Sequence, residues 1–240
     1  MSLPMDRPRQ EHEAEAAAAT GVGELAGLVA GQPRFAEYAL LLESWTGLLS
    51  GPALPLIEDS LTLLSHLEDA RTVVDVGSGG GMPGLPLKLA RPELQVTLLE
   101  SDRRKAAFLI HAAARLDLEL DVVAERAETA GRGPLRDSFD LAVSRALAGP
   151  VSVLLELCLP LVRPGGRLLA MRTAGDVGQD RELETAAAAA EALGGGRPVV
   201  RTAPSAARER GAVLIVPKLS PTPSAFPRRP GVPNRRPLGE

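Results

Sequence analysis

Cysteine and histidine are scarce in this chain of 240 residues, which has one Cys and three His. A single thiol excludes an internal disulfide and a Cys-based zinc site, a usage typical of cytoplasmic proteins. His12, His66 and His111 lack the spacing of metal ligands, so we expect no metal site. Cys158 lies in the apolar stretch 154–159 and is predicted to be a small core residue.

Aromatic residues are also few, at 2% of the chain, so Leu, Val and Ala must build the core. The same scarcity argues against extensive platforms for stacking nucleic-acid bases. No apolar run reaches the roughly 18 residues that a membrane span requires, and we expect no membrane segment. Glu11, Glu13 and Glu15 argue against a signal peptide.

The net charge is small but unevenly distributed. The whole chain carries a formal charge of −3. From Arg197 to the end, nine Lys or Arg residues stand against only Glu209 and Glu240. The acidic excess therefore lies before Arg197, and the basic end predicts a polyanionic partner for the C-terminal region.

The stretch 73–84, Val-Val-Asp-Val-Gly-Ser-Gly-Gly-Gly-Met-Pro-Gly, is the feature around which the chain is organised. Its β-branched residues predict a buried strand, and the glycines that follow predict a tight turn. Because Gly77, Gly79 and Gly81 lack Cβ atoms, backbone N–H groups there can approach a ligand closely. A strand, a glycine turn and a helix in this order predict a binding site rather than a flexible linker.

After this turn, strand-like and helix-like segments alternate. Seven strands are predicted, at 72–76, 95–99, 120–124, 139–144, 166–171, 198–202 and 212–217. Helices are predicted at 85–90, 103–116, 151–161 and 176–193. Such alternation predicts an α/β fold with a mostly parallel sheet and helices on both faces. The short link 203–211 allows the last two strands to form an antiparallel hairpin.

The chain divides into four predicted parts. Residues 1–22 are expected to be a disordered arm, residues 23–70 an N-terminal helical cap, and residues 71–219 the α/β domain. The helical patterns of the cap cover 35–49 and 56–67. Residues 220–240 contain six prolines, which predict an extended basic tail with exposed arginines.

Glu100 directly follows the second predicted strand. The carboxyl ends of parallel strands form the ligand edge of such a sheet, and an acid there accepts hydrogen bonds from a ribose diol. The glycine turn and Glu100 together predict a cofactor that contains adenosine. Pro83 and Pro86 beside the turn, and the acidic body of the chain, favour S-adenosylmethionine over a dinucleotide with its pyrophosphate.

Ordered motifs along residues 73–238 are more specific than the glycine turn alone. They are Asp75–Pro86, Leu99–Leu109, Arg126-Ala127-Glu128, Phe139-Asp140 with Ser144-Arg145-Ala146, Pro164-Gly165-Gly166 and Phe226–Pro233. In this order they resemble the bacterial family that methylates N7 of a guanine in the 16S ribosomal RNA of the small subunit, a family first named for glucose-inhibited division.

The resemblance implies a class I S-adenosylmethionine-dependent methyltransferase fold, which is Rossmann-like, in a cytoplasmic and monomeric enzyme. Its partners would be 16S rRNA and the small ribosomal subunit. Because guanine N7 carries a lone pair and no proton, its methylation requires no general base. We expect the basic end to contact the RNA backbone through Lys218, Arg228, Arg229, Arg235 and Arg236.

The resemblance also implies the residues of the cofactor site, which are Gly77, Gly79, Gly81, Met82, Glu100, Ser101, Ala127, Glu128 and Arg145. Glu100 and Ser101 would hold the ribose, and Ala127 and Glu128 would meet the adenine. Arg145 would lie beside the methionine end of the cofactor and the reaction centre. There it would be the catalytic residue, which orients the reactants or stabilises charge.

Several positions depart from the usual pattern of that family. Met82 replaces a Phe, Pro55-Leu56 replace an Arg-His pair, Arg172-Thr173 replace Lys-Gly, and an Asn-rich stretch is absent. These departures leave two alternatives open. The chain could be a related methyltransferase that acts on a protein or a small molecule, or a non-enzymatic Rossmann-like module that binds nucleic acid.

Overall fold

The computed structural model describes residues 23–49, 51–145, 147, 149–173 and 180–239, and the predicted arm 1–22 lies outside the described residues. The described residues contain a seven-stranded sheet. Its strands are β1 (Thr72–Val76), β2 (Gln95–Leu99), β3 (Asp121–Val123), β4 (Phe139–Arg145), β5 (Val162–Thr173), β6 (Val199–Thr202) and β7 (Gly211–Pro217).

The spatial order of the strands is β3-β2-β1-β4-β5-β7-β6. The strands β1 to β5 pair in parallel, and β7 runs antiparallel to both β5 and β6. These pairings confirm the predicted α/β class and the antiparallel final hairpin. The order reverses at β1, which lies between β2 and β4, so the carboxyl end of β1 is a topological switch point where ligands bind in open sheets.

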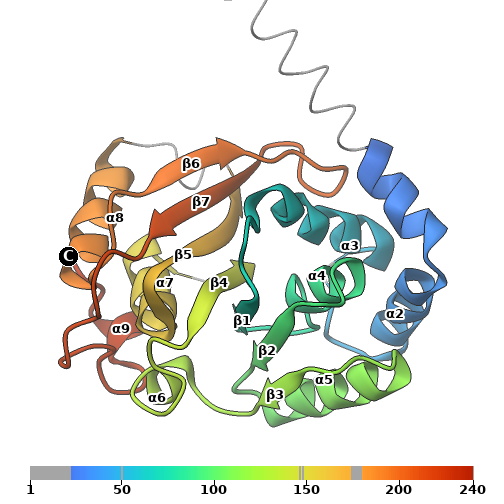
Figure 1. Ribbon diagram of the computed structural model, residues 1–240, viewed down its shortest axis with the longest axis horizontal. Coiled ribbons are helices and arrows are strands. Elements are labelled where there is room, and N and C mark those ends of the chain that lie inside the picture. Colours follow the sequence, from blue (N-terminus) through green and yellow to red (C-terminus); the bar gives the residue numbers. More distant parts are fainter. Residues whose placement is uncertain (1–22, 50, 146, 148, 174–179, 240) are drawn as a thin grey trace, which may run out of the picture.

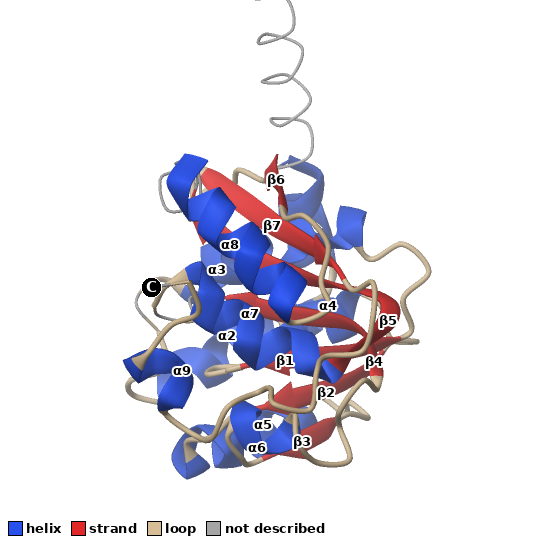
Figure 2. Cartoon of the chain, turned by 90° about the vertical axis from the view of Figure 1, so that its left-hand side faces the viewer, coloured by secondary structure: helices blue, strands red, loops and turns tan. Residues whose placement is uncertain are grey.

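Helices cover both faces of the sheet (Figures 1 and 2). One face carries α4 (Gly84–Ala90) and α5 (Arg103–Arg115), and the other carries α6 (Ala127–Ala130), α7 (Val151–Cys158) and α8 (Asp180–Ala192). A short 3-10 helix, η2 (Leu159–Leu161), leads from α7 into β5. Cys158, the last residue of α7, is fully buried in the core, as predicted.

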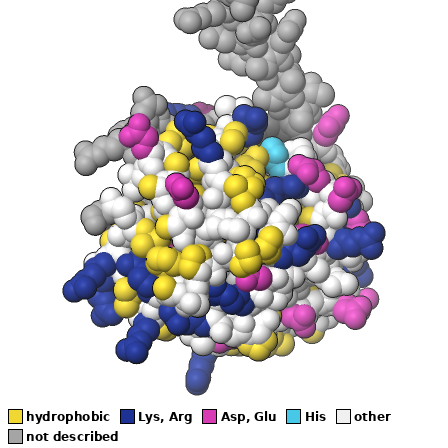
Figure 3. All heavy atoms as spheres, turned by 60° about the vertical axis from the view of Figure 1, so that its left-hand side comes forward, with side chains coloured by type: hydrophobic (Ala, Val, Ile, Leu, Met, Phe, Trp, Pro, Cys, Tyr) yellow, Lys and Arg dark blue, Asp and Glu magenta, His cyan; other side chains and the backbone are white. Residues whose placement is uncertain are grey.

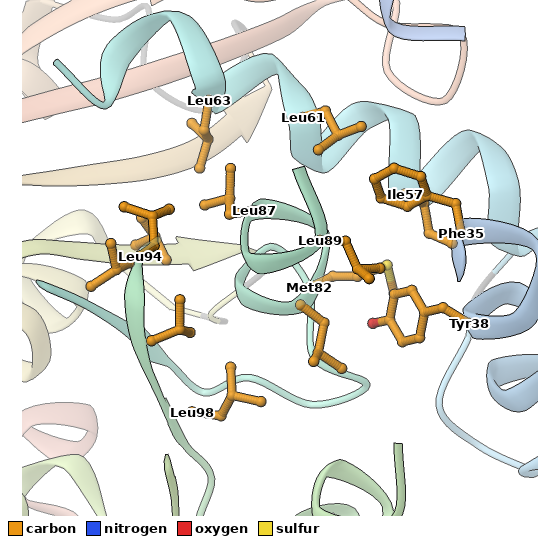
Figure 4. Packing of buried hydrophobic residues seen from close by; sticks show 14 of the residues in the cluster. Phe35, Tyr38, Ile57, Leu61, Leu63, Met82, Leu87, Leu89, Leu94 and Leu98 are labelled. Carbon is orange, nitrogen blue, oxygen red and sulfur yellow. The ribbon is translucent and has the colours of Figure 1, made fainter. Parts of the chain in front are cut away.

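The N-terminal helices pack on the α4 side. They are a helix over 23–31, then α2 (Pro33–Ser44), α3 (Ala53–Leu61) and the 3-10 helix η1 (Thr62–His66). Phe35, Tyr38 and Ile57 are fully buried against α4 (Figure 4). Burying a large apolar side chain contributes about 1.5–3 kcal/mol, so these contacts attach the cap firmly to the sheet.

The cap helices differ from the predicted ranges. The helix expected over 35–49 ends at Ser44, and Trp45, Leu48 and Leu49 pack on the core from a loop instead. The helix expected over 56–67 begins earlier, at Ala53, and tightens into η1 after Leu61. The apolar residues of the cap pack on the core as expected, but some of them, such as Trp45 and Leu48, lie outside the α-helices.

The C-terminal tail is not simply extended, although three of its four arginines, Arg229, Arg235 and Arg236, are exposed as predicted. It lies against α6 and α7 and contains one helical turn, α9 (Val232–Arg235). Arg132 and Arg136, in the loop after α6, donate hydrogen bonds to backbone carbonyls of residues 222–227. These bonds satisfy carbonyl groups that lack partners in a strand or helix, which explains how a proline-rich segment holds one conformation.

Candidate functional site

The glycine turn joins β1 to α4 at the switch point. Gly77, Gly79 and Gly81 have φ angles of 73°, 56° and 95°, a left-handed region that L side chains rarely adopt. Backbone N–H groups of Gly77 and Ser78 donate to the carbonyl of Leu99 at 2.8 and 3.2 Å, which fixes the turn against the end of β2.

Gly77 has a second requirement besides its φ angle. A Cβ atom at this position would lie 2.6 Å from Cδ1 of Leu147. The backbone of the turn therefore forms a floor, and Leu147, from the segment after β4, lies close above it. Gly77 and Leu147 also line one pocket, to which Gly77 presents bare backbone.

Glu100 stands directly after β2 and is tied to the turn. Its Oε2 accepts a hydrogen bond from Gly79 N at 2.9 Å, and its Oε1 accepts one from Asp102 N at 2.8 Å. The residue is only 7% exposed. The carboxylate is thus oriented by backbone groups, and each oxygen keeps a further lone pair for a ligand hydroxyl.

A pocket of about 240 Å³ opens at this edge of the sheet. Its lining brings together residues from the ends of three strands and from the tail: Val76, Gly77, Leu99, Ser101, Glu125, Arg126, Ala127, Glu128, Leu147, Leu157 and Asn234. Four of the predicted cofactor residues, Gly77, Ser101, Ala127 and Glu128, are therefore neighbours. No pattern in the sequence indicated Leu147, Leu157 or Asn234 as site residues.

Glu128 lines this pocket, and its carboxylate is already hydrogen-bonded within the chain. Its side chain is 1% exposed, and both oxygens accept hydrogen bonds from Arg126. Oε1 also accepts one from Gly231 N at 2.9 Å. Burial raises the pKa of Glu128, but the bonds from Arg126 and Gly231 outweigh it and lower the pKa overall. The carboxylate therefore anchors the tail beside the pocket.

Arg145, at the end of β4, lies deeper on the same edge. Its Nη1 donates to the carbonyl of Leu56 at 3.1 Å and contacts Sδ of Met82 at 3.4 Å, and its Nε lies 3.6 Å from Oδ2 of Asp59. Desolvation lowers the pKa of Arg145 and nearby Asp59 opposes this effect; the group stays charged because arginine titrates so high. Met82, 9% exposed, points toward the ring of Tyr38 (Figure 4).

Asp59 lies beside Arg145, and no pattern in the sequence indicated it. Its buried carboxylate accepts hydrogen bonds from Ser205 Oγ at 2.7 Å and from Arg208 Nε at 3.1 Å. It therefore joins the cap to the loop between β6 and β7 and to Arg145. Two guanidinium groups share one carboxylate, so the cluster keeps an excess of positive charge.

Asp75, on β1, supports the turn from below. Its Oδ2 accepts a hydrogen bond from Gly84 N at 2.9 Å. Burial raises the pKa of Asp75 to about 7, with Glu100 adding to the rise and the bond from Gly84 opposing it. Asp75 thus holds together the two ends of the glycine turn, because Gly84 begins α4.

The predicted RNA contacts separate into two groups. The side chain of Lys218 is fully buried and donates to Leu159 O and Thr222 Oγ1. Arg228 pairs with the buried Glu156. Both cations therefore fasten the tail to the body. Arg229, Arg235 and Arg236 are exposed. Figure 3 shows Lys and Arg side chains gathered at the lower left of the face in view.

Among the described residues, no group of three or more His, Cys, Asp or Glu side chains is placed to hold a metal ion. No helix in this part of the chain is long and apolar enough to cross a membrane.

The sheet order, the glycine turn after β1 and the acid after β2 define a class I methyltransferase fold of the Rossmann-like type. Cofactor-bound Rv0187 from MTB shares this fold with a TM-score of 0.55 and 18% identity, over 79% of this chain and 91% of that chain. An O-methyltransferase family protein from Burkholderia thailandensis gives a TM-score of 0.51 and 15% identity, over 69% and 56%.

Residues 54–202 match the family described as rRNA small subunit methyltransferase G, and the chain belongs to this family. It is 48% identical to the ribosomal RNA small subunit methyltransferase G of Moorella thermoacetica over 185 residues, 75% of each chain. It is 40% identical to the protein of that name from Roseiflexus sp. over 216 residues, 85% of this chain and 91% of the relative. These matches confirm the family resemblance seen in the motifs.

Proposed function

We propose that this chain transfers a methyl group from S-adenosylmethionine to N7 of a guanine in the 16S rRNA of the small ribosomal subunit. The observation that carries the proposal is the pocket at the switch point. It unites Gly77, Ser101 and Ala127, which come from three separate motifs, in a chain of the rRNA small subunit methyltransferase G family.

The residues at this edge fit the cofactor. Gly77 presents bare backbone to the pocket, Glu100 would present an oriented carboxylate to a ribose, and the apolar Leu147 and Leu157 line the place for an adenine. When bound, S-adenosylmethionine supplies an electrophilic methyl group on a sulfonium centre. The carboxylate of Glu100 beside the turn suits a cationic ligand.

Arg145 and its neighbours would orient the reactants. Guanine N7 has a lone pair and no proton, so the chain does not need a general base, and catalysis rests on alignment. Arg145 is held by Leu56, Met82 and Asp59. Its Nη2 makes no hydrogen bond to the described part of the chain and is available to a carboxylate, a phosphate or a guanine oxygen.

The target base must be accessible. N7 faces the major groove, which is deep and narrow in A-form RNA, so we expect a loop base or one drawn out of its stack. With few aromatic residues available for stacking, affinity would come mainly from contacts between cations and the RNA backbone. Arg229, Arg235 and Arg236 on the tail are suited to this role because they are exposed near the pocket.

The deciding experiment is methylation of small subunits purified from cells that lack the enzyme. The chain should transfer labelled methyl groups to 16S rRNA, and borohydride with aniline should then cleave the RNA at the N7-methylguanosine. Subunits from cells that contain the enzyme are the control and should accept no further label. Cofactor binding without transfer would favour a protein or small-molecule substrate, and absence of cofactor binding would favour a non-enzymatic module.

A further inference from the structure

We infer that Asn234 binds the adenine of the cofactor, so that the C-terminal tail forms one wall of the adenosine pocket. This inference rests on the proposed function, because it assumes that the pocket lined by Gly77 and Ala127 takes S-adenosylmethionine. It assigns an adenine-binding role to a residue outside the glycine turn and the strand ends.

The position of Asn234 is defined by its neighbours. It lies on α9 and lines the same pocket as Gly77, Ser101 and Ala127. A Cβ built on Gly149, in the segment after β4, would lie 3.7 Å from Oδ1 of Asn234. The amide therefore lies between the segment after β4 and the start of α6, at the mouth of the pocket.

The polar groups of Asn234 are available. Its side chain makes no hydrogen bond within the part of the chain that the structure describes, and the residue is exposed. By contrast, the oxygens of Glu128 are occupied by Arg126 and Gly231 N. A carboxamide offers both donors and an acceptor. It pairs well with the N7 edge of adenine, where the amino donor stands beside the N7 acceptor, whereas hypoxanthine presents two acceptors on that edge.

The tail is held in place by interactions that would preserve this position. Glu128 accepts from Gly231 N at the start of α9. Arg228 donates from its backbone N and its guanidinium to the fully buried Glu156. Glu128 is thus a positioning residue for Asn234. This role accounts for a buried carboxylate in the lining of the pocket.

The inference is tested by calorimetry with two probes, S-adenosylhomocysteine and S-inosylhomocysteine, in which an oxygen replaces the adenine amino group. A bidentate amide–adenine pair discriminates by about 1–3 kcal/mol, so the wild-type chain should bind the inosyl probe about tenfold more weakly. Asn234→Ala should bind S-adenosylhomocysteine about tenfold more weakly and should no longer distinguish the probes.

Ser224→Ala is the matched control, because Ser224 is an exposed polar residue of the same tail outside the pocket lining. It should leave both affinities unchanged. Equal affinity of Asn234→Ala and the wild type would overturn the inference, and so would an equal loss for both probes, which a structural role would produce. If the wild type binds neither probe, the cofactor assignment itself fails and the inference fails with it.

Discussion

The guanidinium Nε of Arg145 lies 3.6 Å from the buried carboxylate Oδ2 of Asp59, across the junction between the cap and the sheet. Asp59 is in turn bound by Ser205 and Arg208 from the loop between β6 and β7. The position of Arg145 therefore depends on two distant segments, the cap and this loop. A change in either should disturb catalysis before it disturbs cofactor binding, since the cofactor pocket has a separate lining.

Arg145→Ala should lower kcat by about 100-fold or more while the affinity for S-adenosylhomocysteine changes little. The reason is that orienting and electrostatic contacts of this kind act mainly in the transition state. Ser205→Ala, which removes one support of Asp59, should give a smaller loss of kcat. Arg167→Ala, on an ion pair with the exposed Glu68, is the control. An unchanged kcat for Arg145→Ala would refute the role assigned to this residue.

Gly77→Ala should destabilise the fold by about 1–2 kcal/mol, since an L residue is strained in the left-handed region. It should also weaken cofactor binding, because the new Cβ meets Leu147 at 2.6 Å and pushes it toward the pocket. Gly79→Ala is the matched variant, since its φ is also positive but no atom lies closer than 3.9 Å to the added Cβ. If both variants bind S-adenosylhomocysteine equally well, displacement of Leu147 does not affect cofactor binding.

Replacing Arg229, Arg235 or Arg236 singly by Ala should weaken binding to 16S rRNA and lower the slope of log affinity against log salt by about one per lost phosphate contact. Filter binding over a series of salt concentrations measures this. Deleting the whole tail would be misleading, because Arg228 and Asn234 would be lost with it. Arg91→Ala, at the end of α4 on the opposite edge of the sheet, should change neither quantity.

The pH dependence of stability should carry a contribution from Asp75. Its pKa is about 7 in the fold against a usual 3.8, so the folded state keeps a proton that the unfolded chain releases. The free energy of unfolding from this group therefore falls as pH rises from about 4 to about 7. Asp75→Asn does not titrate and should gain stability relative to the wild type over this window. Urea unfolding at a series of pH values measures this. If the free energy of unfolding changed with pH equally in the two proteins, the assignment would be contradicted.

Arg228→Ala should cost about 3 kcal/mol in the free energy of unfolding, because it leaves the buried carboxylate of Glu156 without its partner. The double variant with Glu156→Gln should recover part of the loss, since no buried charge then remains. A double-mutant cycle from urea unfolding measures the coupling. Additive losses would show that the two side chains do not stabilise each other.

The sequence allowed the sheet to be predicted closely because local patterns determine it. Strands β1 and β2 have the predicted bounds, since a β-branched run bordered by turn residues leaves little freedom. The strand β5 was predicted too short. It begins at Val162, which pairs with Phe139 before a register shift, and the intervening Pro-Gly-Gly looked like a turn.

The site was only partly predictable, since its other contacts are long-range. Gly77 and Glu100 have local signals, namely a glycine turn and an acid after a strand. Asp59 has none, because its partners Ser205 and Arg208 are 146 and 149 residues away. The same limit applies to Lys218, which is predicted to contact RNA, although its amine donates to Leu159 O and Thr222 Oγ1 in the interior.

The antiparallel direction of β7 places the start of the tail at the edge of the sheet away from the pocket. Pro217, at the end of β7, pairs with Arg167 at the amino edge of the sheet, so the chain must return along α6 and α7 to bring Asn234 to the opposite edge. A nascent chain that has just released Pro217 from the ribosome contains every strand of the described sheet but lacks one wall of the pocket. Proteolysis at the same point in the finished protein would leave the same incomplete site.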